Sequence, residues 1–412
     1  MREDQILLEL LRAFMTGEVP RLTEKNIIWE KIYERSMMHN VFPMVYEAAL
    51  RSSAFGKAKE ELRQIWKRQT IATVMSQMQR TSRFLNLYRK MNEEGLRVLV
   101  VKGLICRQLY TKPDHRISND EDLYICSRDF ERCHRLFLRE GLKADAGSNL
   151  DDKDVVSYYD IVSGLHIELH RQLFSESSKA YGSFNSIFEN SIENQVIQRV
   201  EGVPVRTMNH TDHMLFLICH SLKHFLHSGF GIRQVCDMVM FANAYGSNIN
   251  WHYIMKKLRQ IHGDVFWINL VAIGELYLGF SRKRANFYPE KYRARAGTDP
   301  DALLDDILEA GVFGKSTENR IHSSNITLDA YAEHGSSVGS ALLRTIFPGR
   351  RYLTKRYPVL EKFPVLFPVM WLYRLLSYGM KLIPRKEKYV PLTGSLNIGS
   401  KRIELMKKYR II

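Results

Sequence analysis

Hydrophobic and polar positions change their spacing twice along the chain. Residues 1–94 repeat with helical spacing, and Gly95 ends a long amphipathic pattern that begins at Gly56. Residues 95–209 alternate short apolar runs with helix-length segments, and the helical spacing returns from residue 210 to about residue 280. This order predicts an α/β fold of the α+β type, in which a mixed β-sheet core is flanked by N-terminal and C-terminal helical regions.

The pattern also predicts the individual elements of the core and the division of the chain. The expected strands cover 97–101, 120–126, 154–162 and 164–170, the expected helices cover 104–110, 128–140 and 179–192, and a hairpin over 195–207 turns at Gly202. We therefore expect four parts: a helical region over 1–94, the sheet core over 95–209, a second helical region over 210–340, and a basic tail over 341–412.

Composition narrows the class of protein. With 412 residues and 45% hydrophobic content, the chain is long enough to bury a large core. Its five cysteines form no Cys-x-x-Cys pair and no disulfide-like spacing, which favours a reducing compartment. The N-terminus begins with an amphipathic pattern rather than a signal peptide. We therefore predict a cytoplasmic protein without a transmembrane segment.

The positive charge is concentrated at the C-terminal end. Residues 341–412 contain 16 Lys and Arg against 3 acidic residues, so they carry +13 of the net charge of +15. Such a segment could contact RNA, an anionic membrane surface or an acidic face of its own protein. Within it, the apolar stretch 363–373 is shorter than the roughly 20 residues of a membrane span, and we favour a core-packing helix after Pro368 over an interfacial membrane helix.

The chemistry of the chain is carried by three carboxylates. Asp120 and Asp122 open an apolar run, and alternation along a strand places both on one face. Glu168 lies on a later expected strand, between apolar neighbours. Such carboxylates are the hard ligands that hold Mg²⁺ against phosphate groups. Upstream, a β-branched strand ends in Lys102-Gly103, a turn whose glycine allows close approach of a phosphate and whose lysine adds charge.

These motifs resemble the nucleotidyltransferase superfamily, and specifically a large uncharacterised bacterial branch with Lys-Gly in place of the usual Gly-Gly or Gly-Ser turn. The resemblance rests on the strand to Lys102-Gly103, on Arg116, on the run from Asp120 to Ile125 and on Glu168 to His170. It implies that Asp120, Asp122 and Glu168 bind Mg²⁺ or Mn²⁺ and perform catalysis, with Glu168 as metal ligand or base. Lys102, Gly103 and Arg116 would contact phosphate. The implied reaction transfers an NMP from an NTP such as ATP to an acceptor, which could be a small molecule, an RNA or a protein, and releases pyrophosphate.

A row of histidines follows the core. His213, His220, His224 and His227 lie along one side of an expected helix. The resemblance extends over residues 215–237, and on that ground we expect His220, His224, Arg233 and Asp237 to face the cleft, together with His170 of the core motif. We interpret His213 and His227 as structural.

Two positions differ from the superfamily pattern, and two alternatives remain open. Leu104 replaces the usual serine, and Glu121 stands where an apolar residue is more usual. Because a buried charge is costly, we expect Glu121 at an exposed strand start. One alternative is a catalytically degenerate nucleotide- or RNA-binding protein of the same fold. The other is a zinc hydrolase that uses His166, Glu168 and His170, which would leave Asp120, Asp122 and Lys102 without a role.

Overall fold

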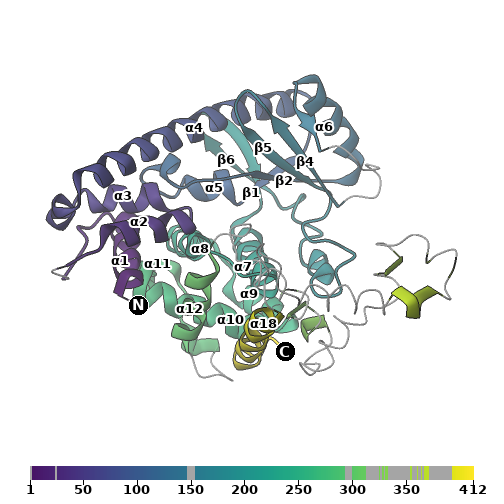
Figure 1. Cartoon of the computed structure of the whole chain (residues 1–412). Coiled ribbons are helices and arrows are strands. Elements are labelled where there is room, and N and C mark those ends of the chain that lie inside the picture. The colour runs from purple at the N-terminus through teal and green to yellow at the C-terminus, as the bar shows by residue number, and fades with distance from the viewer. Residues whose placement is uncertain are drawn as a thin grey trace.

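The structure is a computed structural model that describes residues 2–23, 26–145, 154–292, 299–311 and 392–412, with single residues and short runs between 324 and 370. Its elements follow the predicted order of helices, sheet and helices (Figure 1), which confirms the α+β class. The N-terminal elements are α1 (Arg2–Thr16), α2 (Trp29–Met38), α3 (Phe42–Ala49), η1 (Ser53–Lys57) and α4 (Glu60–Glu93).

The long helix α4 joins two hydrophobic cores. Its first half packs Leu62 and Trp66 against the N-terminal helices, where the Trp66 indole N–H donates to the Phe42 carbonyl at 3.0 Å. Its second half packs Phe84, Tyr88 and other side chains into the core of the sheet. Figure 1 shows α4 running along the top of the sheet. The helix therefore fixes the sheet relative to the N-terminal helices.

A mixed five-stranded sheet lies beneath α4 (Figure 1). Its strands are β1 (Val98–Val101), β2 (Glu121–Ile125), β3 (Lys143–Ala144), β4 (Val155–Asp160) and β5 (Leu165–His170), in the order β1-β2-β5-β4-β3. Strands β2 and β5 are parallel, and the other pairs are antiparallel. Between β1 and β2 lie α5 (Gly103–Arg107) and η2 (Pro113–His115). The expected hairpin is β6 (Val196–Val200) and β7 (Val203–Thr207).

The two faces of the sheet differ in chemistry because side chains alternate along each strand. One face carries apolar side chains such as Val100, Leu123 and Leu169, which pack with α4 and with α6 (Ser127–Arg139). The opposite face carries Asp122 and Glu168, which are paired residues in the parallel register of β2 and β5. The polar side chains of Asp122 and Glu168 therefore lie on one face of the sheet, and the hydrophobic core covers the other face.

Helices also follow the sheet, as the pattern predicts. They are α7 (His210–Leu226), α8 (Ile232–Tyr245), α9 (Trp251–Gln260), α10 (Asp264–Ile273), α11 (Arg282–Ala285), α12 (Pro300–Ala310) and α18 (Leu392–Lys408), with the short turns η5 (Gly246–Asn248), η6 (Gly274–Leu278) and η7 (Pro289–Tyr292). The Asn209 side chain caps α7 by accepting the Asp212 N–H at 3.0 Å. These helices share one hydrophobic core with α1, α2 and α3.

One expected helix is wrong. Of the segment 179–192, the structure forms only the 3₁₀ turn η4 (Gly182–Ile187). The Asn185 side chain bonds to both backbone groups of Phe174, accepting its N–H at 3.0 Å and donating to its carbonyl at 2.7 Å. Such side-chain to backbone bonds compete with helical bonds, and here they tie the segment to the chain that follows β5.

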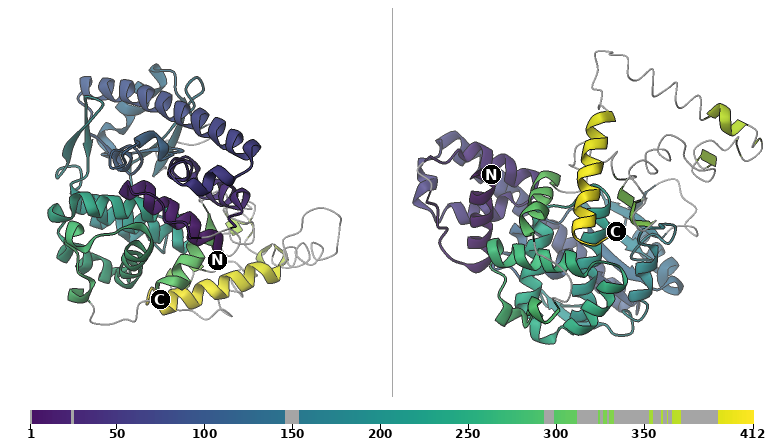
Figure 2. Two further views of the ribbon diagram at one scale, coloured as in Figure 1. Left: turned by 90° about the vertical axis from the view of Figure 1, so that its left-hand side faces the viewer. Right: turned by 90° about the horizontal axis from the view of Figure 1, so that it is seen from below.

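Part of the basic tail packs onto the protein itself. Helix α18 lies against the helices of the C-terminal half (Figure 2), and its Arg402 is buried. Of the helix expected after Pro368, Val369 is 58% exposed, so the core-packing interpretation is wrong for this side chain. Most of the remaining tail lies outside the described residues. Among the helices that the structure describes, none is both long and apolar enough to span a bilayer.

Candidate active site

Asp122, Glu168 and His170 form the centre of the polar face. Since Asp122 and Glu168 are direct neighbours in the register of β2 and β5, their carboxylates point to the same side, and His170 follows Glu168 by two residues. One ligand atom from each of the three residues lies within 4.8 Å of the other two. The His170 Nε2 is 3.2 Å from Asp122 Oδ1 and 3.4 Å from Glu168 Oε2. This spacing suits a shared cation.

The charges of Asp122, Glu168 and His170 stabilise one another. Burial lowers the pKa of His170, but the hydrogen bonds to Asp122 and Glu168 outweigh burial and leave that pKa above its ordinary value. Burial raises the pKa of Asp122, yet Lys102 and His170 together bring it below its usual range. The hydrogen bond from His170 also lowers the pKa of Glu168. Both carboxylates are therefore held in the charged form that a metal ion requires.

Asp120 lies immediately before β2. It is half-buried, and it is not a member of the three-residue group that the described residues form. Burial and the nearby charge of Asp122 raise the pKa of its carboxyl, whereas Lys102 opposes that shift. The structure thus brings two of the three predicted catalytic carboxylates together and places the third beside them.

The Lys102-Gly103 turn is held in an unusual backbone conformation directly above this group. Lys102 has a φ of +57°, and its N–H donates to His213 Nε2 at 3.1 Å. Its ammonium lies 2.8 Å from Asp122 Oδ2. At Gly103 an added Cβ would come within 2.7 Å of both Ser118 Oγ and Glu121 Oε2, so a larger residue would displace two hydrogen-bonded side chains. Glycine therefore allows the turn to pack closely against the start of β2.

Glu121 differs from its expectation. It is buried rather than exposed, because two donors meet its carboxylate on the far side of β2. The Leu104 N–H donates to Oε2 at 3.0 Å, and the equally buried Arg107 donates to Oε1 at 2.6 Å. The glutamate therefore ties the first turn of α5 to β2. A charged residue replaces the usual apolar one because a buried arginine stands opposite.

Helix α7 contributes two imidazoles. The Lys102 ammonium donates to His220 Nε2 at 3.0 Å, and His224 Nε2 lies 3.2 Å from the same atom. Burial, followed by the charge of Lys102, lowers the pKa of His220 well below its ordinary value. Burial and Lys223 do the same to His224. Both rings are thus neutral at pH 7; His220 contacts the lysine of the turn, and His224 contacts His220.

Lys223 is a further cation at this site, and the sequence reasoning did not select it. It lies one turn from His220 on α7, and its ammonium lies 5.8 Å from the centre of the Tyr181 ring. Burial and the charge of Lys102 lower its pKa. Its spacing of three residues from His220 was the available signal, because such spacing places two residues on the same helix face.

Arg116, Asp237 and Arg233 form a second buried cluster. Arg116 makes a two-pronged ion pair with Asp237, which also accepts the Tyr110 hydroxyl at 3.0 Å. Arg233 donates to the Ile117 carbonyl, and burial lowers its pKa to about 10. These contacts support the loop that leads into Asp120. A phosphate contact by Arg116 stays a prediction.

Comparison with known families agrees with this geometry. A family model described as an uncharacterised nucleotidyltransferase matches residues 25–278. The chain belongs to this nucleotidyltransferase family. The match spans every candidate site residue named above, so the resemblance first based on a few motifs is confirmed at the level of the family. The comparisons with curated proteins and with solved structures found no significant match.

The family places the chain among the transferases. The family assignment does not support the zinc hydrolase alternative. In the structure, His166 also does not join Glu168 and His170 in one ligand group among the described residues. His166 stacks on Tyr159 with 4.3 Å between ring centres, and among the described residues the group that could hold a metal ion contains Asp122 in place of His166.

Proposed function

We propose that this protein is a Mg²⁺-dependent enzyme that transfers an NMP from an NTP to an acceptor hydroxyl and releases pyrophosphate. The observation that carries the proposal is the contact of Lys102 with Asp122, at the centre of the group that Asp122, Glu168 and His170 form. Carboxylates that can hold a cation, next to a lysine that can meet phosphate, are the parts that nucleotidyl transfer needs.

The residues fit a divalent cation. Two carboxylates supply the oxygen ligands that Mg²⁺ prefers, and the imidazole of His170 can act as a third ligand, one that also suits Mn²⁺, once the arriving cation displaces the proton that His170 shares with the carboxylates. Asp120 lies close enough to raise the pKa of Lys102 and to have its own pKa raised by Asp122, and it can complete the ligand set. When bound, the cation would neutralise charge on the transferred phosphate and orient it.

The two central carboxylates are suited to different tasks. The side chain of Asp122 is 4% exposed and contacts Lys102 and His170, so it lies in the interior of the site. The side chain of Glu168 is 32% exposed and its pKa is lowered by His170, so it is an ionised carboxylate within reach of solvent. Glu168 can therefore accept the proton of the attacking hydroxyl, whereas Asp122 remains a ligand.

Lys102 and Lys223 can supply the positive charge that a bound triphosphate requires. Burial lowers the pKa of Lys102, but Asp122 and Asp120 outweigh burial and keep the ammonium charged. Lys223 lies on the adjacent α7 and adds a second positive charge near the same carboxylates. Fixed positive groups of this kind stabilise charge that develops on a leaving pyrophosphate.

Transfer of label tests the proposal. Purified protein is incubated with each α-³²P-labelled NTP and Mg²⁺ or Mn²⁺, with and without a cell extract, and the wild type is compared with Asp122→Asn/Glu168→Gln. Glu131→Gln, an exposed carboxylate on α6, serves as the matched control. We expect label on an acceptor with the wild type and the control alone. Transfer that survives the double substitution would refute the metal-site assignment.

The same samples address the binding-only alternative. If the wild type neither transfers label nor binds nucleotide in the presence of Mg²⁺, the chain is a degenerate member of its family. Contacts of the basic tail with RNA or an anionic membrane stay a prediction, since most of that segment lies outside the described residues.

A further inference from the structure

The face of the sheet that carries Asp122 and Glu168 is open to solvent over β4. Helix α7 contacts this face at Lys102, on the side of β1. Strand β4 lies on the other side of β5, and its side chains on the same face are exposed or half-buried. On the opposite face of β4, Val156 and Tyr158 are buried in the core. The carboxylates therefore border an open surface on the side of β4.

Tyr159 is the large aromatic side chain of this open surface. It is 44% exposed, and among the Phe, Tyr and Trp residues that the structure describes, only Phe363 is exposed as well. The antiparallel register of β4 and β5 pairs Ser157 with Glu168 and Tyr159 with His166. Paired residues share a face, so Tyr159 is a diagonal neighbour of Glu168. An exposed aromatic ring next to a candidate active site is suited to ligand contact.

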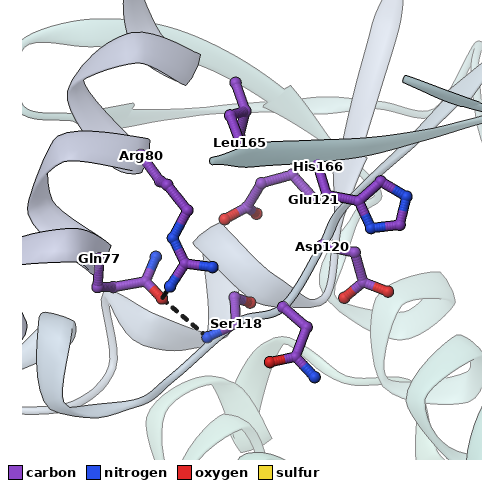
Figure 3. A pocket seen from close by; sticks show the side chains of 8 residues that line it. Gln77, Arg80, Ser118, Asp120, Glu121, Leu165 and His166 are labelled. Atoms are coloured by element: carbon purple, nitrogen blue, oxygen red, sulfur yellow. Dashed lines mark hydrogen bonds between the residues drawn. The ribbon is translucent and has the colours of Figure 1, made fainter. Parts of the chain in front are cut away.

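His166 holds the Tyr159 ring in a fixed orientation. The two rings are stacked, with 4.3 Å between their centres and an angle of 6° between their planes. His166 also lies beside Asp120, because both residues line one small pocket at the start of β2 (Figure 3). The Tyr159–His166 stack therefore leads from the carboxylates to the open surface, and its flat ring is ordered before any ligand arrives.

A positive charge lies next to the stack. Strand β3 pairs Lys143 with Tyr159, so the exposed Lys143 side chain lies on the same face of the sheet. Proteins hold single-stranded nucleic acids with this combination, in which aromatic rings stack on bases and cations meet the phosphates. A molecule that contains both a base and a phosphate therefore matches this surface.

The expected direction of the reaction assigns the surface to the acceptor. Lys223 lies on α7, and Lys102 contacts that helix, so the cations suited to pyrophosphate lie on the side away from β4. In an in-line displacement, the attacking group enters opposite the leaving group. Glu168, which is suited to accept the proton of the attacking hydroxyl, is the carboxylate that neighbours β4. The acceptor then approaches across the open surface.

We propose that the Tyr159–His166 stack binds a nucleobase of the acceptor and that Lys143 contacts a phosphate of the same molecule. This inference rests on the proposed function and narrows the acceptor to a nucleotide, either free or at the end of a nucleic acid strand. Diagonal neighbours across two strands lie about 7–8 Å apart, a distance that one nucleotide can span. A base on Tyr159 would therefore bring a ribose hydroxyl toward Glu168.

Binding of two probes tests the stack. The probes are AMP and a fluorescein-labelled adenylate hexamer, each offered with Mg²⁺ and an excess of α,β-methylene NTP, which fills the donor site without being transferred. We expect the wild type to bind the hexamer, and Tyr159→Ala to bind it about 5- to 150-fold more weakly, the range for losing one stacked base. Displacement of the hexamer by AMP identifies a free nucleotide as sufficient, whereas failure of AMP to displace it identifies a strand.

Three further variants separate stacking from a general effect on the fold. Tyr159→Trp keeps a stacking ring and should retain binding. Lys143→Gln should weaken binding and make it less dependent on salt, because one phosphate contact is lost. Ile197→Ala is the control, since Ile197 is an exposed apolar residue on the separate β6–β7 hairpin. Circular dichroism confirms that each variant folds.

The transfer assay gives a second readout. Tyr159→Ala should raise the KM for the acceptor by a factor similar to its loss of binding, while the KM for the NTP stays as in the wild type. If the wild type transfers label but does not bind the hexamer or AMP, or if Tyr159→Ala behaves like Ile197→Ala, the stacking site is refuted while nucleotidyl transfer stands. If the wild type neither transfers label nor binds NTP with Mg²⁺, the proposed function fails and the stack loses its acceptor role.

Discussion

The imidazole of His213 accepts the backbone N–H of Lys102 at 3.1 Å. Because that N–H is a donor, Nε2 must carry the lone pair, and Nδ1 then donates to Thr207 Oγ1 at 3.2 Å. Burial lowers the pKa of His213 to about 3, which keeps the ring neutral. A histidine that is completely buried thus holds the backbone of the lysine whose ammonium contacts Asp122.

This contact predicts the effect of replacing the histidine. His213→Phe removes the acceptor and leaves the Lys102 N–H buried without a partner, which should destabilise the fold by about 1–3 kcal/mol. The positive φ of Lys102, a conformation that costs of the order of 1–3 kcal/mol, would then lose its support. We expect a lower Tm and a fall in kcat in the transfer assay.

Two comparisons make this prediction specific. His213→Gln can still accept through its amide oxygen and should recover part of the kcat. His252→Phe, an exposed histidine on α9, should change neither quantity. Wild-type kcat in a folded His213→Phe variant would contradict the positioning role.

A second prediction concerns the buried pair of Glu121 and Arg107. Glu121→Ala would leave the Arg107 guanidinium buried without its carboxylate, and breaking such a pair from one side costs about 3–5 kcal/mol. The urea midpoint of unfolding measures the loss. Glu121→Gln should cost less, since its oxygen can still accept the Leu104 N–H. A midpoint for Glu121→Ala equal to that of the wild type would show that the pair is not a structural link.

Much of the fold and the centre of the site could be predicted from the sequence because they depend on local periodicity. Strict alternation after Asp120 and around Glu168 fixes the faces of two strands, and their pairing brings Asp122 next to Glu168. The resemblance supplied the pairing that periodicity does not contain. Asp122 and Glu168, two members of the group that could hold a metal ion, therefore follow from spacing together with family membership, whereas Asp120 was expected in that group and His170 takes its place there.

The rest depended on contacts between distant segments. Glu121 and Arg107 are 14 residues apart, and Arg80 meets the start of β2 from a helix whose pattern shows no unusual feature at that position. Arg116 was expected to meet phosphate, yet the structure places Asp237 against it from α8. No spacing rule joins residues of different helices, so these partners were visible only in three dimensions.

A third prediction concerns pH and the buried His39. Burial lowers its pKa from 6.5 to about 4 in the folded protein. Below pH 6.5 the unfolded chain takes up a proton that the folded chain resists, so stability falls as the pH decreases from about 6.5 to 4 and changes little from this group below that range. The shift of 2.5 pKa units corresponds to at most about 3 kcal/mol.

Urea unfolding at a series of pH values measures this effect. His39→Gln should show a shallower loss of stability than the wild type between pH 6.5 and 4, because the substituted side chain does not titrate. Parallel curves for the two proteins would show that His39 does not contribute. Buried His213 and half-buried His227 retain their own pH dependence in both proteins, so the difference between the curves isolates the contribution of His39.

A fourth prediction links the C-terminal helix to the active site. Buried Arg402 of α18 donates to the carbonyls of Phe225 and His227, at the end of α7, and lies 3.6 Å from Asp306. A cation at the carboxyl end of a helix satisfies free carbonyls and opposes the negative end of the helix dipole. Because α7 also carries His220 and Lys223, the end of the chain supports the helix that contacts the Lys102 turn.

Arg402→Met should therefore lower both stability and transfer. Removing one partner of a buried charged contact predicts a loss of about 3–5 kcal/mol in the free energy of unfolding. Lys401→Met is the matched control, because Lys401 neighbours Arg402 on the same helix and is exposed. If Arg402→Met retains the wild-type Tm and kcat, the basic residues of α18 do not support α7, and a role for this arginine toward an external partner becomes the better explanation.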